Sequence, residues 1–129
     1  MKKVILFVLA VLTLGACQES LEERCARECT EFTKRKCPSQ VAQEMVIDSM
    51  SFDRASHTIA HYYKLTGNSD RADAYEKDQA RELLKNELKN TTQVMVYKEA
   101  GYSFRYIYYS EKNPETVYLD ILLTEKDYQ

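Results

Sequence analysis

Cysteine and histidine are the residues whose types could support chemistry in this chain of 129 residues, which has four Cys and two His. Three of the cysteines, Cys25, Cys29 and Cys37, lie in one short polar segment. A zinc site would require a fourth ligand beside these thiols. His57 and His61 are four residues apart in a predicted strand, roughly 13 Å from one another, so they cannot both bind one ion. We therefore expect neither a metal site nor a bound cofactor.

The pairing of the three thiols has several possible outcomes. On a helix, the Cβ atoms of Cys25 and Cys29 would be about 5–6 Å apart, beyond the ~3.5–4.5 Å that a disulfide prefers. Cys37 can pair back to either of them more easily, because a turn at Pro38 can fold the chain. Either pairing leaves one thiol, which is free or forms a disulfide-linked dimer. Three free thiols, or redox or metal chemistry at these cysteines, are the alternatives.

Other catalytic patterns are missing from the sequence. There is no Gly-x-Ser-x-Gly motif, and three scattered glycines are too few for a phosphate-binding loop. The carboxylates Asp73, Glu76 and Asp78 are expected on the solvated face of a charged helix. The formal charge of −2, from 18 basic and 20 acidic side chains, gives no electrostatic basis for binding nucleic acid. We expect a protein that is not an enzyme.

The N-terminal segment has the charge order and length of a secretory signal peptide. Lys2 and Lys3 form a positive start, and residues 4–14 are apolar except for Thr13. This apolar run is shorter than the about 17–25 residues that a membrane-spanning helix needs. Residues 1–16 are therefore predicted to be a signal peptide that is absent from the mature protein.

The residues that follow resemble the lipobox of bacterial lipoproteins, in the sequence Leu14-Gly15-Ala16-Cys17. The resemblance implies cleavage before Cys17, a diacylglycerol joined to its sulfur by a thioether, and an acyl chain on its new amine. Several lipid chains anchor a protein stably to a membrane. Gln18 follows, rather than the Asp that often retains lipoproteins in the inner membrane, so the resemblance implies the outer membrane, on its periplasmic or surface side.

The mature chain is predicted to begin with a lipidated tether and an amphipathic helix, residues 17–40. Its polar residues 18–36 contain neither Gly nor Pro, and Cys25, Cys29 and Phe32 form a narrow apolar stripe at helical spacing. Pro38 ends this helix because it disfavours helical backbone at the preceding residue.

Residues 41–129 are predicted to form one α+β domain in the order β-β-α-α-β-β. The expected elements are strands 44–52 and 58–65, helices 71–89 and 93–100, and strands 103–110 and 116–124. Two hairpins separated by helices favour a four-stranded antiparallel sheet with the helices on one face. Ser69 or Asp70 could cap the first helix, and Gly101 is placed to end the second.

Alternation in the last strand predicts which residues face the helices. Val117, Leu119, Ile121 and Leu123 are expected to point inward against Leu83, Leu84 and Leu88. The opposite face would then carry Tyr62, Lys64, Tyr118 and Asp120. Tyrosine is common in half-buried strands and is also enriched at interfaces. This uncovered face is therefore a candidate binding surface.

From Asp48 to Tyr128 the sequence also resembles small envelope lipoproteins of Bacteroides-like bacteria, a group to which no activity is attached. The resemblance rests on short phrases such as residues 48–52, 61–63 and 97–101. Taken together, the sequence predicts a lipid-anchored envelope protein that binds another envelope macromolecule or supports assembly. The alternative function is a thiol-based redox or metal-handling lipoprotein that uses Cys25, Cys29 and Cys37.

Overall fold

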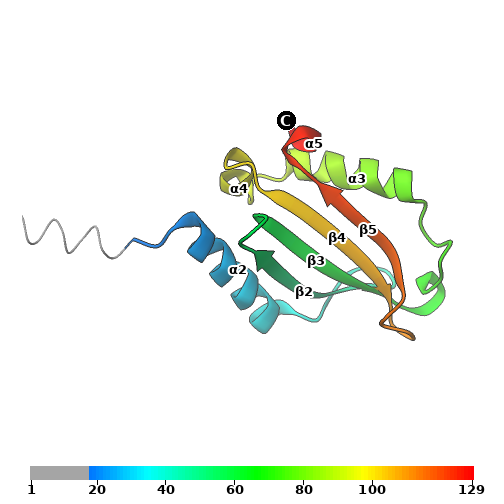
Figure 1. Cartoon of the computed structure of the whole chain (residues 1–129). Coiled ribbons are helices and arrows are strands. Elements are labelled where there is room, and N and C mark those ends of the chain that lie inside the picture. The colour runs from blue at the N-terminus through cyan, green and yellow to red at the C-terminus, as the bar shows by residue number, and fades with distance from the viewer. Residues whose placement is uncertain (1–17) are drawn as a thin grey trace, which may run out of the picture.

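The computed structural model describes residues 18–129, so the predicted signal peptide and Cys17 lie outside the described residues. The α+β class and the predicted order of hairpins and helices are confirmed (Figure 1). The helices are α2 (Leu21–Lys36), the 3₁₀ turn η1 (Gly67–Ser69), α3 (Lys77–Asn90), α4 (Met95–Glu99) and α5 (Glu125–Tyr128). The strands are β1 (Ser39–Ala42), β2 (Met45–Asp53), β3 (Thr58–Leu65), β4 (Ser103–Ser110) and β5 (Val117–Leu123).

The sheet is mixed and has five strands, in the order β1-β2-β3-β4-β5. The prediction of four antiparallel strands is therefore wrong in two respects. Strands β3 and β4 pair in parallel, while the other neighbours are antiparallel. A parallel pair needs a long crossover connection, and the segment containing α3 and α4 provides it. The fifth strand, β1, was missed because its four residues are all exposed and show no alternation.

Helix α2 is part of the folded core, although the sequence placed it in a separate N-terminal segment. Ser20 caps the helix by accepting a hydrogen bond from the Glu23 amide at 3.1 Å. Cys25 and Cys29 are buried with the residues of the sheet. The Thr33 hydroxyl accepts from the Met50 amide at 2.9 Å and donates to the Met50 carbonyl at 3.0 Å. Helix and strand β2 are thus joined by polar as well as apolar contacts.

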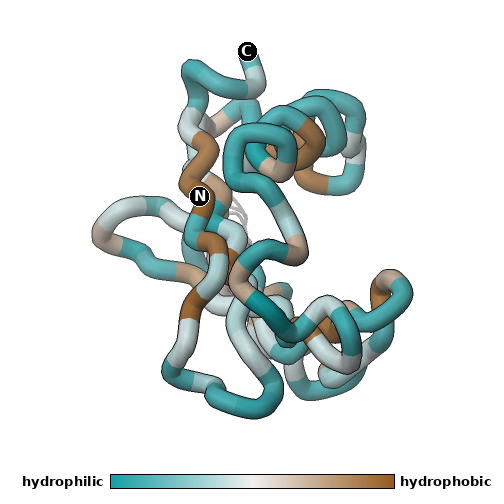
Figure 2. The backbone as a smooth tube through the Cα atoms, turned by 90° about the vertical axis from the view of Figure 1, so that its right-hand side faces the viewer, coloured by the Kyte–Doolittle hydropathy of each residue, from teal (hydrophilic) through white to brown (hydrophobic). Residues whose placement is uncertain are grey.

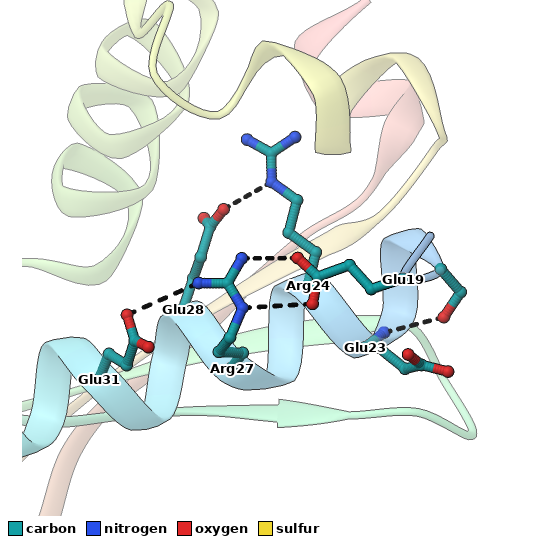
Figure 3. Close-up of polar contacts among 7 residues, drawn as sticks. Glu19, Glu23, Arg24, Arg27, Glu28 and Glu31 are labelled. Carbon is teal, nitrogen blue, oxygen red and sulfur yellow. Dashed lines mark hydrogen bonds and ion pairs between the residues drawn. The ribbon is translucent and has the colours of Figure 1, made fainter. Parts of the chain in front are cut away.

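The outer surface of α2 carries a network of ion pairs (Figure 3). Arg27 binds Glu19 at 2.6 Å and Glu31 at 3.6 Å, and Arg24 binds Glu28 at 2.6 Å. The Arg27 hydrogen bond lowers the pKa of the Glu19 carboxyl. Exposed pairs of this kind contribute little stability each. Their clearer consequence is that Glu19, only two residues after Cys17, is held against the helix.

Helix α3 begins at Lys77, later than the predicted start at Arg71. Glu76, rather than Ser69 or Asp70, is the N-cap, and its carboxylate accepts hydrogen bonds from the amides of Asp78 and Gln79 at 3.1 and 2.8 Å. These bonds lower the pKa of the Glu76 carboxyl. The preceding residues form turns after η1, because Asp70 instead binds the Lys112 amide and the Tyr118 hydroxyl.

One face of the sheet packs against both longer helices, and Figure 2 shows these helices on the same side of the sheet. Of these two helices, only α3 was predicted on this face, because α2 was predicted in the N-terminal tether. Leu119, Ile121 and Leu123 are buried there, with exposed fractions of 6%, 1% and 0%. The inward position predicted for Val117 is wrong, since this side chain is 51% exposed. A register shift lets Val117 pair with Tyr109 while Leu119 pairs with Tyr108. Tyr118 is the extra residue of this β-bulge, and the bulge interrupts the alternation.

The second helix of the crossover, predicted over residues 93–100, and the glycine that ends it are confirmed. Helix α4 ends before Gly101, whose φ of 79° is the left-handed conformation that glycine adopts without strain. The Tyr128 hydroxyl donates to the carbonyls of Lys98 and Tyr102 at 3.1 and 2.9 Å, so the C-terminal turn is tied to the end of α4. No helix within residues 18–129 is long and apolar enough to cross a membrane.

Candidate functional site

The helix-covered face of the sheet contains a groove that runs along α3. Two hollows of 410 and 560 Å³ make up this groove, and they adjoin because Tyr63 and Glu87 line both. The smaller hollow lies between α2 and α3 and is closed at one end by Gln93, Val94 and Tyr97. The larger one lies between α3, strand β1 and the turn residues 74–76. Together they form a depression that follows α3 for most of its length.

The walls of the groove come from regularly spaced helix residues. On α3 the lining residues Gln79, Leu83, Glu87 and Thr91, the last being its C-cap, recur at every fourth position. This spacing is that of one helix face, and twelve residues of helix rise about 18 Å. The opposite wall of the smaller hollow is the α2 face that carries Cys25, Glu28, Cys29 and Phe32.

The floor of the groove is a ladder of stacked aromatic rings on β3 and β4. The parallel register places His61 beside Tyr106 and Tyr63 beside Tyr108. The ring centroids of these two pairs are 4.7 and 4.9 Å apart, and both pairs are stacked. An antiparallel pairing of these strands would match other residues, so the ladder depends on the parallel register and cannot be predicted from the two strands alone.

The floor is uncharged at neutral pH. Burial lowers the pKa of His61 to about 4, although its hydrogen bond to the Arg105 carbonyl opposes this shift. Since a carbonyl can only accept, the His61 Nδ1 must be the donor in this 3.3 Å contact. Burial and, to a smaller extent, the Glu87 charge raise the pKa of Tyr63 to about 12. The imidazole is therefore neutral and the phenol stays protonated.

The ionised groups that line the groove are all acidic. They are Glu28, Glu76 and Glu87, and neither hollow has a lysine or an arginine among its lining residues within the described chain. Glu28 is paired with Arg24, and Glu76 caps α3. Glu87 has no ion-pair partner in residues 18–129. Its unneutralised carboxylate lies where the two hollows meet.

Apolar side chains are unusually exposed along the larger hollow. Leu83 is 62% exposed, Val41 is 51% exposed and Tyr75 is 38% exposed, and all three line this hollow. Leu83 was expected to pack against β5, but Leu84 and Leu88 take the core positions of α3 instead. Contiguous exposed apolar surface on a small soluble domain commonly marks an interaction site.

The three predicted thiols are free in the structure. Cys25 and Cys29 face the groove from α2 but are only 1% and 4% exposed. The hydrogen bond with Cys29, together with burial, raises the pKa of the Cys25 thiol, so Cys25 retains its proton. The same hydrogen bond lowers the pKa of Cys29. No group of three metal-ligating side chains lies together within residues 18–129, and a disulfide-linked dimer gains no support.

Cys37 should be the most reactive of these thiols. In a soluble form that starts at Gln18, we expect a thiol reagent such as DTNB to modify Cys37 rapidly and to reach buried Cys25 and Cys29 only after unfolding. One rapid equivalent should become three in denaturant, and Cys37→Ser should remove the rapid one. A single titratable thiol in the denatured, unreduced protein would show that two of the cysteines form a disulfide.

The predicted binding surface lies mainly on the other, open face of the sheet. Tyr62, Ile107 and Asp120 are matched in register across β3, β4 and β5, and Lys64 lies one row further along, beside Tyr109. Tyr118 is different, since it packs against the core residues and donates a hydrogen bond to Asp70 at 2.8 Å. Of the four predicted residues, all except Tyr118 therefore lie on the open face.

The open face is largely occupied by its own side chains. Arg105 binds Asp120 through two hydrogen bonds of 2.8 and 2.5 Å, and Tyr109 donates to the Asp48 carboxylate. Ile107 is buried among them although no helix of residues 18–129 covers this face. The hollow that remains, between Tyr62 and Pro114, measures 240 Å³. This hollow is smaller and shallower than either hollow of the groove.

The fold is that of a class of small α+β domains that includes solved bacterial proteins. The pilotin AspS of the type II secretion system of Vibrio cholerae is 14% identical, with a TM-score of 0.61 over 83% of this chain and 91% of that protein. The pilotin EpsS of the Vibrio vulnificus type 2 secretion system is 12% identical, with a TM-score of 0.66 over 84% and 92%. A candidate secreted protein from Pseudomonas aeruginosa is 10% identical, with a TM-score of 0.65 over 87% and 100%.

At these identities the likeness to solved structures is a likeness of fold. The chain itself belongs to the family described as a domain of unknown function, DUF8479, whose model matches residues 20–119. The matched range begins at the Ser20 cap of α2 and includes both longer helices and β1–β4 entire. No curated protein matches the sequence.

Proposed function

We propose that this chain is a lipid-anchored envelope protein that acts as a non-enzymatic assembly module, and that it binds a partner protein in the groove along α3. The observation that carries this proposal is the groove itself. It has exposed apolar walls and an aromatic floor that is uncharged at neutral pH.

The resemblance to pilotins supports the class of function. Pilotins belong to type II secretion systems, and their fold covers nearly all of the described domain. Because fold alone does not establish function, the groove has to supply the specific argument. A comparable role for this chain is assistance in the assembly of an envelope complex, with an attachment to the outer membrane through Cys17.

The short connection between Cys17 and α2 strengthens this proposal. Helix α2 begins at Leu21, and four residues span at most about 14 Å. Glu19 is also held against the helix by Arg27. If Cys17 carries the lipid, the α2 wall of the groove lies close to the membrane surface, where an envelope partner would be assembled.

The groove is a stronger candidate surface than the open face. Apolar burial drives association, and Leu83, Val41 and Tyr75 offer exposed apolar area in one place. On the open face, by contrast, the charges of Arg105 and Asp120 already satisfy one another. The open face stays the second candidate, because Leu122 is 45% exposed there, in register with Arg105.

Charge placed in the groove should prevent partner binding without unfolding the domain. We expect Leu83→Asp to reduce recovery of the partner from solubilised membranes by at least about tenfold, because its carboxylate would have to be desolvated against apolar surface. Since Leu83 is 62% exposed, the melting temperature should change little. The measurement is quantitative affinity purification of the lipidated chain, with partners identified by mass spectrometry.

Leu122→Asp on the open face is the matched control, as it makes the same substitution at a similarly exposed leucine. It should retain the partner. Loss of the partner in Leu122→Asp alone would move the docking surface to the open face. Equal recovery from both variants and the unchanged protein would contradict docking at either surface.

A further inference from the structure

Glu87 occupies a special position in the groove. It lines both hollows, so it lies at the middle of the α3 wall, four residues from Leu83 in one direction and from Thr91 in the other. Its side chain is exposed, and the described chain gives it no basic neighbour within ion-pair distance. An apolar groove therefore has one uncompensated negative charge at its centre.

The other carboxylates of the groove are already satisfied. Glu28 is 2.6 Å from the Arg24 guanidinium, as Figure 3 shows, and Glu76 accepts two amide hydrogen bonds at the N-terminus of α3. The floor next to Glu87 supplies no countercharge, because the nearby rings of Tyr63, Tyr106 and Tyr108 carry only hydroxyls. An apolar occupant would leave the Glu87 carboxylate partly desolvated and unpaired, at a cost in binding.

The occupant must also satisfy its own backbone. Strands β3 and β4 of the floor each have a hydrogen-bonded neighbour on both sides, and the two walls are helices whose backbone groups bond internally. The two edge strands of the sheet also line the groove, but β1 is only four residues long and β5 contributes only Leu119. An extended segment laid over the floor would therefore bury unpaired amides. A helix would not.

Groove length and composition set the size of that helix. The α3 wall from Gln79 to Thr91 corresponds to about 18 Å, which is about three helical turns. Such a helix would place apolar residues at i, i+3, i+4 and i+7 on the tyrosine floor, the usual pattern of a helix bound in a groove.

We propose that the groove binds an amphipathic helix of a partner protein, and that a lysine or arginine near the middle of this helix forms an ion pair with Glu87. The inference rests on the proposed function, since it specifies the partner of the same groove. The positive charge satisfies the one carboxylate that an apolar helix would leave unpaired. It also gives the groove a means of selecting this helix over helices with acidic or purely apolar faces.

The first part of the test identifies the bound segment. A photo-crosslinking amino acid is placed at Leu83 in the full lipidated chain, in its native host, and at Leu122 as the control position on the open face. Mass spectrometry of the crosslinked peptides gives the partner sequence. A segment with helical apolar periodicity and a lysine or arginine within its central turns, crosslinked from position 83 only, is the expected result.

The second part measures the ion pair with that segment as a synthetic peptide. Glu87→Gln should weaken binding by about tenfold, and the loss should shrink at high salt because screening weakens the pair. Glu82→Gln, an exposed acidic residue of the same helix that does not line the groove, should have no effect. A peptide with glutamate in place of the basic residue should bind poorly, and Glu87→Lys should restore its binding.

The possible failures are distinguishable. No crosslink from position 83 would overturn the proposed function together with this inference. A crosslinked segment that lacks a basic residue, or one that forms an extended rather than a helical complex, would overturn the inference while leaving docking in the groove intact. Equal affinity of the unchanged protein and Glu87→Gln for the peptide would also overturn the inference and leave docking in the groove intact.

Discussion

Replacing Cys17 by serine is expected to release the protein from the membrane entirely. The Leu14-Gly15-Ala16-Cys17 sequence predicts that the thioether to diacylglycerol forms on the Cys17 sulfur, and a serine hydroxyl cannot replace that thiol. No helix of residues 18–129 has the length and apolar character needed to cross a membrane. Metabolic labelling with a fatty acid and membrane fractionation measure the effect, and both signals should fall to background.

Cys37→Ser is the matched control for this experiment, because it removes a thiol that lies outside the lipobox motif. Labelling and membrane association should be unchanged in it. Persistent fatty-acid labelling of Cys17→Ser would refute the lipoprotein assignment, and with it the argument that the groove is held near a membrane. Docking in the groove would still be testable through Leu83→Asp.

Truncating Ile121 is expected to cause the largest loss of stability among the changes considered. Ile121 is 1% exposed and belongs to the core between β5 and the helices. Ile121→Ala should lower the free energy of unfolding by about 2–5 kcal/mol, since it removes buried methyl groups and leaves a cavity. Urea unfolding of the soluble domain measures the difference, provided that the two proteins have the same m-value.

Leu122→Ala tests whether this cost comes from burial. Its side chain is the next along the same strand but points to the open face and is 45% exposed, so the change should cost less than about 1 kcal/mol. Tyr62→Ala, on the same face, should likewise cost less than Ile121→Ala. Equal destabilisation by Ile121→Ala and Leu122→Ala would mean that the open face is buried as deeply as the core.

Local signals were sufficient for most elements of the fold. Strands 58–65 and 103–110 were predicted with the bounds that the structure gives them, because turn residues flank both. The end of α4 at Gly101 was predicted as well, since a glycine at this position accepts a left-handed backbone. The start of α3 was misjudged. Asp70, a good cap by type, bonds instead to Lys112 and Tyr118, which are distant in sequence.

The sequence by itself also determined the predicted location in the cell envelope and the inward face of β5 from Leu119 onward. Signal peptides and lipoboxes are read as short linear motifs, and strand alternation is a property of the backbone, so neither depends on distant residues. The absence of a recognisable catalytic motif is likewise a property of the local sequence, and it was the basis for predicting a binding protein rather than an enzyme.

Only the tertiary structure decided where the groove lies and what lines it. Parallel pairing of β3 with β4 creates the His61–Tyr106 and Tyr63–Tyr108 stacks, and this pairing depends on how the crossover through α3 returns to the sheet. The bulge at Tyr118 turns Val117 outward. Leu83 and Leu84 are neighbours in one helix, but Leu84 is in the core while Leu83 faces the groove. Successive residues of a helix point in different directions, so the packing of α3 on the sheet decides which of the two leucines is covered.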